Sequence, residues 1–191
     1  MAEAQGVWPH KVTYQTRWLD NDQYGHLNNS SYYLIADSII NAYLVNACGI
    51  QPFIYPSATS SPSVPPSASS TGATSAPTIP AKPPTPTSPA PQSNDVDAAS
   101  IVGLVISNSC RYFASASFPA PLDVGMRVIK LGTSSVTYQA SIGEQGGQTA
   151  AVITSTHVFV DRHTRRPVKM PKAVREPLAK LLVELPKESK L

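Results

Sequence analysis

The chain has 191 residues, a length typical of one domain or of one domain with an insertion. Its net charge of +3 is modest, and its 14% of charged and 7% of aromatic residues are low for a globular protein. A basic cluster between Arg162 and Lys169 lacks interleaved aromatic residues, zinc-finger spacing or a basic helix, so no nucleic acid partner is expected. No apolar run approaches the ~20 residues that cross a bilayer, so we expect no membrane span.

The first folded elements are a strand and a long helix. Lys11 to Trp18 alternates and is rich in β-branched and aromatic residues, which predicts a half-buried strand. From Ser30 onward apolar residues recur at steps of three and four, which predicts a helix that is covered on most sides. Asn28 and Asn29 are suited to cap its start together with Ser30, and Gly49 is suited to end it.

The segment from Pro52 to Asn94 differs from the rest of the chain in composition. It consists mostly of Pro, Ser, Thr and Ala, and it holds 12 of the 19 prolines. Such a segment cannot bury enough apolar surface to offset its ordering entropy, so we predict disorder or polyproline II structure. We therefore expect a single folded domain over residues 8–185, with residues 52–94 inserted in it and residues 186–191 as a tail.

Strand patterns follow in series after the insertion. They cover Ile101–Tyr112, Met126–Leu131, Val136–Ile142 and Gln148–Val160, and a short helix is predicted over Pro171–Leu182. The short connections with glycine favour an antiparallel sheet. The order of strand, long helix and four strands predicts an α+β fold, in which the antiparallel sheet wraps around one dominant helix.

The most informative stretch, Arg17 to Asn29, lies between the predicted strand and the long helix. Within it, the ten residues 20–29 hold two carboxylates, a glycine, an imidazole and four amides. A carboxylate beside the unpaired N–H groups that open a helix can act on a polarised carbonyl. Calcium binding fails on spacing, because Tyr24 and Ser31 occupy positions that an EF-hand gives to acidic or amide ligands. A serine hydrolase is disfavoured because the sequence has no Gly-x-Ser-x-Gly.

The pattern Arg-Trp-x-Asp-x-Asp-x-x-Gly-His-x-Asn-Asn-x-x-Tyr is present from Arg17 to Tyr32. Together with the element order, it resembles the 4-hydroxybenzoyl-CoA thioesterase-like acyl-CoA thioesterases of the hot-dog fold. The segments Phe118–Gly125 and Val160–Val168 resemble two further loops of that family. The resemblance implies a thioester hydrolase that converts acyl-CoA and water to free acid and CoA. It also implies a homodimer or homotetramer with the acyl-CoA site at the subunit interface, and no metal or cofactor beyond the CoA of the substrate.

The resemblance implies that Asp22 attacks the thioester carbonyl or activates the water that does, while the Asn29 N–H polarises the carbonyl oxygen. Thioester hydrolysis needs a nucleophile or base and donors where negative charge develops, which agrees with this assignment. The alternative for Asp22 is a carboxylate that caps the helix or stabilises the loop. For Asp20 that structural role is the favoured one.

The predicted substrate-binding residues are Gly25, His26, Asn28 and Asn29. Gly25 is expected to supply a backbone conformation or a close approach that a side chain would block. His26 could orient the loop or line the site. Asn28 and Asn29 are expected first of all to cap the helix.

Three questions remain open at the level of sequence. Arg127, Lys130 and the pair Arg165–Arg166 could meet the CoA phosphates as exposed cations. A hot-dog domain that binds acyl-CoA or scaffolds a partner without turnover is the alternative function. The acyl chain length and any aromatic preference are not determined by the motif.

The last three residues are Ser189, Lys190 and Leu191, which match the peroxisomal Ser-Lys-Leu address. An arbitrary tripeptide ends a chain by chance roughly once in 8,000, so coincidence is a poor explanation of this match. We therefore predict recognition by the peroxisomal import receptor and a location in the peroxisomal matrix, with the cytoplasm as the alternative.

Overall fold

The structure, a computed structural model, describes residues 6–51 and 97–185. Its contacts divide the chain into one unit made of Met1–Pro52 with Asp95–Leu191 and a second unit, Phe53–Asn94. The predicted disordered insertion and the Ser-Lys-Leu end lie outside the described residues. None of the helices in the described part is long and apolar enough to cross a membrane.

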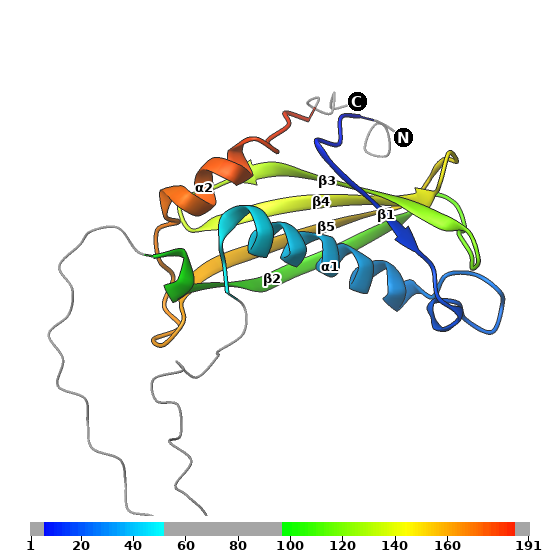
Figure 1. Ribbon diagram of the computed structural model, residues 1–191, viewed down its shortest axis with the longest axis horizontal. Helices are drawn as coiled ribbons and strands as arrows, with labels where there is room; N and C mark the ends of the chain where they lie inside the picture. Colours follow the sequence, from blue (N-terminus) through cyan, green and yellow to red (C-terminus); the bar gives the residue numbers. More distant parts are fainter. Residues whose placement is uncertain (1–5, 52–96, 186–191) are drawn as a thin grey trace, which may run out of the picture. The chain divides into compact units, whose positions relative to one another are not determined.

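The described unit is built on a five-stranded antiparallel sheet with the strand order β1-β3-β4-β5-β2. The strands are β1 (His10–Gln15), β2 (Ile101–Tyr112), β3 (Pro121–Leu131), β4 (Ser135–Glu144) and β5 (Thr149–Asp161). The helix α1 (Asn29–Cys48) lies along one face of the sheet, as Figure 1 shows. This arrangement confirms the predicted α+β hot-dog architecture with a single dominant helix.

Shorter elements complete the unit. They are the 3-10 turns η1 (Trp18–Asp20) and η2 (Ala98–Ser100) and the helix α2 (Lys172–Ala179). The predicted first strand was too long, because the chain leaves the sheet after Gln15 and turns into η1. The third strand was predicted too short, since β3 begins at Pro121, a position where a strand tolerates proline.

The core lies between α1 and the inner face of the sheet. Buried residues of α1, among them Ile35, Ile39 and Leu44, belong to the same cluster as Val124 and Met126 of β3. Burial of side chains of this size stabilises a fold by about 1.5–3 kcal/mol each, before conformational entropy is counted. The helix therefore packs against the sheet through the apolar face that its sequence periodicity predicts.

The two ends of α1 are determined locally. At the start, the Asn28 side chain accepts a hydrogen bond from the Ser30 N–H at 2.9 Å. At the end, Gly49 adopts the left-handed conformation with a φ of 69°, and its N–H donates to the Leu44 carbonyl. Both predicted caps are confirmed.

Candidate functional site

The loop that joins β1 to α1 is closed on itself and tied to the chain after β2. Asn21 and Leu27 form an antiparallel bridge, and within it the Asp22 N–H donates to the His26 carbonyl at 2.8 Å. The Leu27 N–H donates to the Ala116 carbonyl at 2.7 Å, which fixes the loop against a segment distant in sequence. Backbone pairing of this kind holds the loop in one conformation beside the start of α1.

Asp20 is the anchor of this loop. It is only 2% exposed, and its Oδ2 accepts hydrogen bonds from the Arg17 N–H at 2.7 Å and from the Tyr14 hydroxyl at 2.9 Å. Its Oδ1 accepts from the Arg17 guanidinium at 2.8 Å. Burial alone would raise the pKa of Asp20, but these hydrogen bonds outweigh it and hold the pKa below its ordinary value. The carboxylate thus has the loop-holding contacts that the sequence favours.

Asp22 lies at the other side of the loop and is partly exposed. Its Oδ1 accepts hydrogen bonds from the Tyr24 N–H at 2.8 Å and from the His26 N–H at 3.3 Å. Among the residues that the structure describes, Oδ2 accepts none. One oxygen of the carboxylate therefore orients the group, and the other is available for chemistry.

The other predicted site residues surround Asp22 in different ways. Gly25 has a φ of 81°, and a Cβ added there would meet nothing within 4 Å, so the backbone conformation and not a close approach requires glycine. His26 is exposed and contributes its backbone to the loop. Asn28 caps α1, and the Asn29 N–H that follows it donates to none of the described residues.

A cavity of about 520 Å³ opens beside this loop, a size within the usual range for small-molecule sites. Its lining combines polar and aromatic side chains: Trp18, Asn21, Asp22, Gln23, Gly25 and Phe118. Of the predicted site residues it brings together Asp22 and Gly25, while His26, Asn28 and Asn29 are not in the lining.

Sequence reasoning missed four lining residues, namely Trp18, Asn21, Gln23 and Phe118. Trp18, Asn21 and Gln23 fall inside the motif, where they could have been considered. Phe118 is separated from the loop by α1 and β2, and the only sequence signal for it was that its segment resembles a loop of the family. Phe118 contacts Trp18 and Asn21 of the motif only because the folded chain brings these distant segments together.

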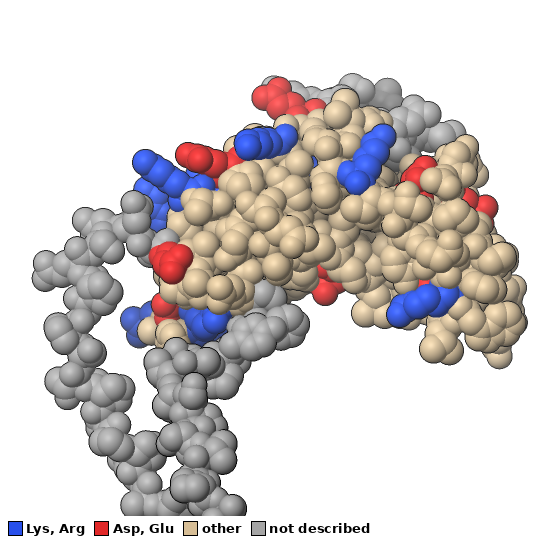
Figure 2. Space-filling model, in the orientation of Figure 1, with Lys and Arg blue, Asp and Glu red and all other residues tan. Residues whose placement is uncertain are grey.

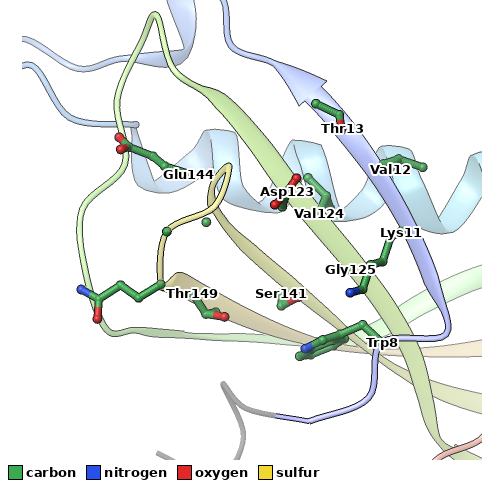
Figure 3. A pocket seen from close by; sticks show the side chains of 13 residues that line it. Trp8, Lys11, Val12, Thr13, Asp123, Val124, Gly125, Ser141, Glu144 and Thr149 are labelled. Carbon is green, nitrogen blue, oxygen red and sulfur yellow. The ribbon is translucent and has the colours of Figure 1, made fainter.

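A second cavity, of about 330 Å³, lies between Trp8 and strands β1, β3 and β4 (Figure 3). It contains none of the predicted site residues. Beside it, the guanidinium carbon of Arg127 lies 4.1 Å from the centroid of the Trp8 ring, and Arg127 donates two hydrogen bonds to the Gln139 side chain. Gly125 allows this packing, because a Cβ there would come within 2.8 Å of Trp8.

The expectation that Arg127 is an exposed cation for CoA phosphates is therefore wrong. Arg127 is 1% exposed, and Trp8, in the segment before β1, packs over its guanidinium. Lys130, Arg165 and Arg166 are exposed, as that prediction requires of them. Their part in phosphate binding stays a prediction.

The comparisons with known proteins agree with this fold. The profile of the thioesterase-like superfamily matches residues 16–178. Among solved structures, the PA5185 protein from Pseudomonas aeruginosa strain PAO1 is 32% identical to this chain, with 92% of each chain covered and a TM-score of 0.65. No curated protein matches the chain.

Two more distant structures share the fold. One is the protein SAV2348 from Staphylococcus aureus in complex with CoA, which is 10% identical, with 95% of this chain and 92% of that chain covered and a TM-score of 0.62. The other is Slr0204, a 1,4-dihydroxy-2-naphthoyl-CoA thioesterase from Synechocystis, which is 12% identical, with 90% and 96% covered and a TM-score of 0.56.

The antiparallel sheet on one dominant helix and the family match together identify a thioester hydrolase of the hot-dog fold. The chain belongs to the thioesterase-like superfamily.

Proposed function

We propose that the protein hydrolyses an acyl-CoA thioester to the free acid and CoA, with Asp22 as the reacting carboxylate. The observation that carries this proposal is the position of Asp22, which lines a cavity beside the loop that leads into α1. The CoA bound to the structurally similar SAV2348 supports CoA as the carrier of the acyl group.

In this mechanism Asp22 acts on the thioester carbon either directly or through a water molecule. Both routes require an ionised carboxylate and pass through a tetrahedral intermediate with negative charge on oxygen. The Asn29 N–H at the start of α1 would donate to that oxygen, and the loss of one such donor typically costs about 3 kcal/mol in the barrier. The thiolate of CoA then leaves. On the water route this gives the free acid at once. On the direct route it leaves an anhydride between the acyl group and Asp22, which a water molecule hydrolyses to the free acid and the Asp22 carboxylate.

The experiment that tests this function is the release of free CoA from a panel of acyl-CoA substrates, measured with a thiol reagent. The alternative, an acyl-CoA-binding or scaffolding domain without catalysis, predicts binding of the same compounds with no release. A panel in which every compound binds and none is cleaved would contradict the hydrolase proposal.

We also propose that two copies of the chain pair through β2, which forms one edge of the sheet. Residues Leu104, Val105 and Ile106 of this long strand are exposed, and such an apolar edge is a template for pairing with another strand. The far end of β2 approaches the start of α1, where the rings of Tyr112 and Tyr32 lie 5.5 Å apart. A partner strand along β2 would thus come close to the Asp22 loop.

Figure 2 shows the face on which α1 lies, with few charged side chains in its middle. We expect Ile106→Lys to convert the dimer to monomers and to lower CoA release, because the lysine would place an unpaired charge in the interface. Leu182→Lys is the matched control, since Leu182 is exposed but lies outside β2. Analytical ultracentrifugation measures the change, and an unchanged oligomer in Ile106→Lys would contradict the proposal.

We propose a peroxisomal location, with Ser189, Lys190 and Leu191 as the address, provided that Leu191 is the natural carboxyl end. A fluorescent protein fused to the amino terminus should appear in peroxisomes, and the same fusion without the last three residues should remain in the cytoplasm. Fluorescence microscopy of the two fusions measures the difference. A punctate peroxisomal signal from the truncated fusion would contradict this assignment.

A further inference from the structure

We infer that Trp18 and Phe118 form the wall against which the acyl group lies, so that these two side chains determine which acyl groups reach Asp22. The inference rests on the proposed function and concerns residues to which the motif assigns no role.

The two rings make an aromatic corner inside the cavity of Asp22. Their centroids lie 5.9 Å apart and their planes are inclined at 82°, an edge-to-face contact. Trp18 is 78% exposed, an unusual state for so large an apolar side chain. A ring that is held by one edge and open to solvent on the other side offers apolar surface to a ligand.

The corner is rigidly connected to the loop that carries Asp22. The Phe118 N–H donates to Oδ1 of Asn21 at 3.0 Å, and Nδ2 of Asn21 donates to the Gly25 carbonyl at 3.3 Å. One residue earlier, the Ser117 N–H donates to the Glu144 side chain at 3.0 Å. These bonds tie the backbone of Phe118 to the loop that carries Asp22.

The polarity of the lining assigns this wall to the acyl side of the thioester. The pantetheine arm of CoA carries two amides, which suit the exposed amide side chain of Gln23. The acyl chain has only apolar atoms beyond its carbonyl, and the aromatic corner is where they can leave water. Asp22 lines the same cavity as both kinds of side chain, so a carbonyl that reacts with Asp22 would lie near both.

The test compares two substrates that differ only in the acyl chain, acetyl-CoA and hexanoyl-CoA. We expect Trp18→Ala to lower the ratio of kcat/KM for hexanoyl-CoA to that for acetyl-CoA by roughly tenfold, because part of the surface that covers the four extra methylene groups is lost. Phe118→Leu should lower the ratio by a smaller factor. Leu19→Ala is the matched control, since Leu19 is 87% exposed in the same turn but does not line the cavity.

A binding measurement keeps the test independent of turnover. Trp18 is one of two tryptophans, so its fluorescence reports directly on the wall. A non-hydrolysable hexanoyl-CoA thioether should shift the emission to shorter wavelength in the wild type but not in Trp18→Phe, and free CoA should cause no such shift.

The outcomes separate the wall from the proposed reaction. A fluorescence shift without CoA release from any substrate would remove the hydrolase function and retain the wall. CoA release with an unchanged ratio in Trp18→Ala would retain the function and overturn the wall. A ratio that falls equally in Leu19→Ala, or an altered oligomeric state in Trp18→Ala, would also overturn it, because exposed apolar surface in general would then be responsible.

Discussion

Replacement of Asp22 by Asn is expected to lower kcat for CoA release by about 10²–10⁴-fold, the range that a positioned acid–base group contributes. The amide keeps an oxygen that can accept the hydrogen bonds of the Tyr24 and His26 N–H groups, so the loop retains its conformation. What the amide cannot do is attack a thioester carbon or remove a proton from water. The measurement is the steady-state rate of CoA release with saturating substrate.

Binding and position provide the controls for this variant. Asp22→Asn should bind the hexanoyl-CoA thioether with an affinity close to that of the wild type, because the substitution changes charge and not shape. Asp37→Asn is the matched carboxylate control, since Asp37 is exposed on α1 and does not line the cavity of Asp22. Full activity in Asp22→Asn would refute the role of Asp22.

Replacement of Asp20 by Ala is expected to lower the free energy of unfolding at pH 7 by about 2–4 kcal/mol. The substitution removes the acceptor of the Arg17 N–H, the Tyr14 hydroxyl and the Arg17 guanidinium, and it leaves a space in a buried position. Urea unfolding followed by circular dichroism measures the change. In contrast, Asp37→Asn should unfold within about 0.5 kcal/mol of the wild type, as exposed substitutions usually do.

The pH dependence of this loss has a defined sign. The pKa of Asp20 is lower in the folded protein than in the unfolded chain, so its contribution is fully present above the ordinary carboxyl pKa of about 4. The contribution disappears as the pH falls through the lowered pKa. The difference between wild type and Asp20→Ala should therefore shrink from pH 5 to pH 2, and a difference that stays constant over this interval would contradict the assignment.

Features that depend on nearby residues could be predicted from the sequence. The long helix was expected to start at Ser30 and to stop at Gly49, and α1 extends from Asn29 to Cys48. Its apolar period, its Asn cap and its terminal glycine are all local, and they agree with one another. The strand after the insertion was predicted over Ile101–Tyr112, the bounds that β2 has in the structure.

Features that depend on contacts across the fold could not be predicted. An arginine is usually exposed, and the burial of Arg127 depends on Trp8, which packs over its guanidinium from a different segment of the chain. The end of β1 was missed because Asp20, bound to Arg17 and Tyr14, turns the chain away from the sheet. Neither effect leaves a periodic signal in the sequence.

The sequence by itself determined the class of fold and the carboxylate loop at the start of the helix, because strand alternation, helix period and caps act between near neighbours. Only the tertiary structure decided what surrounds Asp22. It brought Phe118 against Trp18 and joined it to Asn21 by a hydrogen bond, although the intervening chain contains α1 and β2. Which apolar side chains share a cavity is set by the packing of distant segments, and no local pattern encodes it.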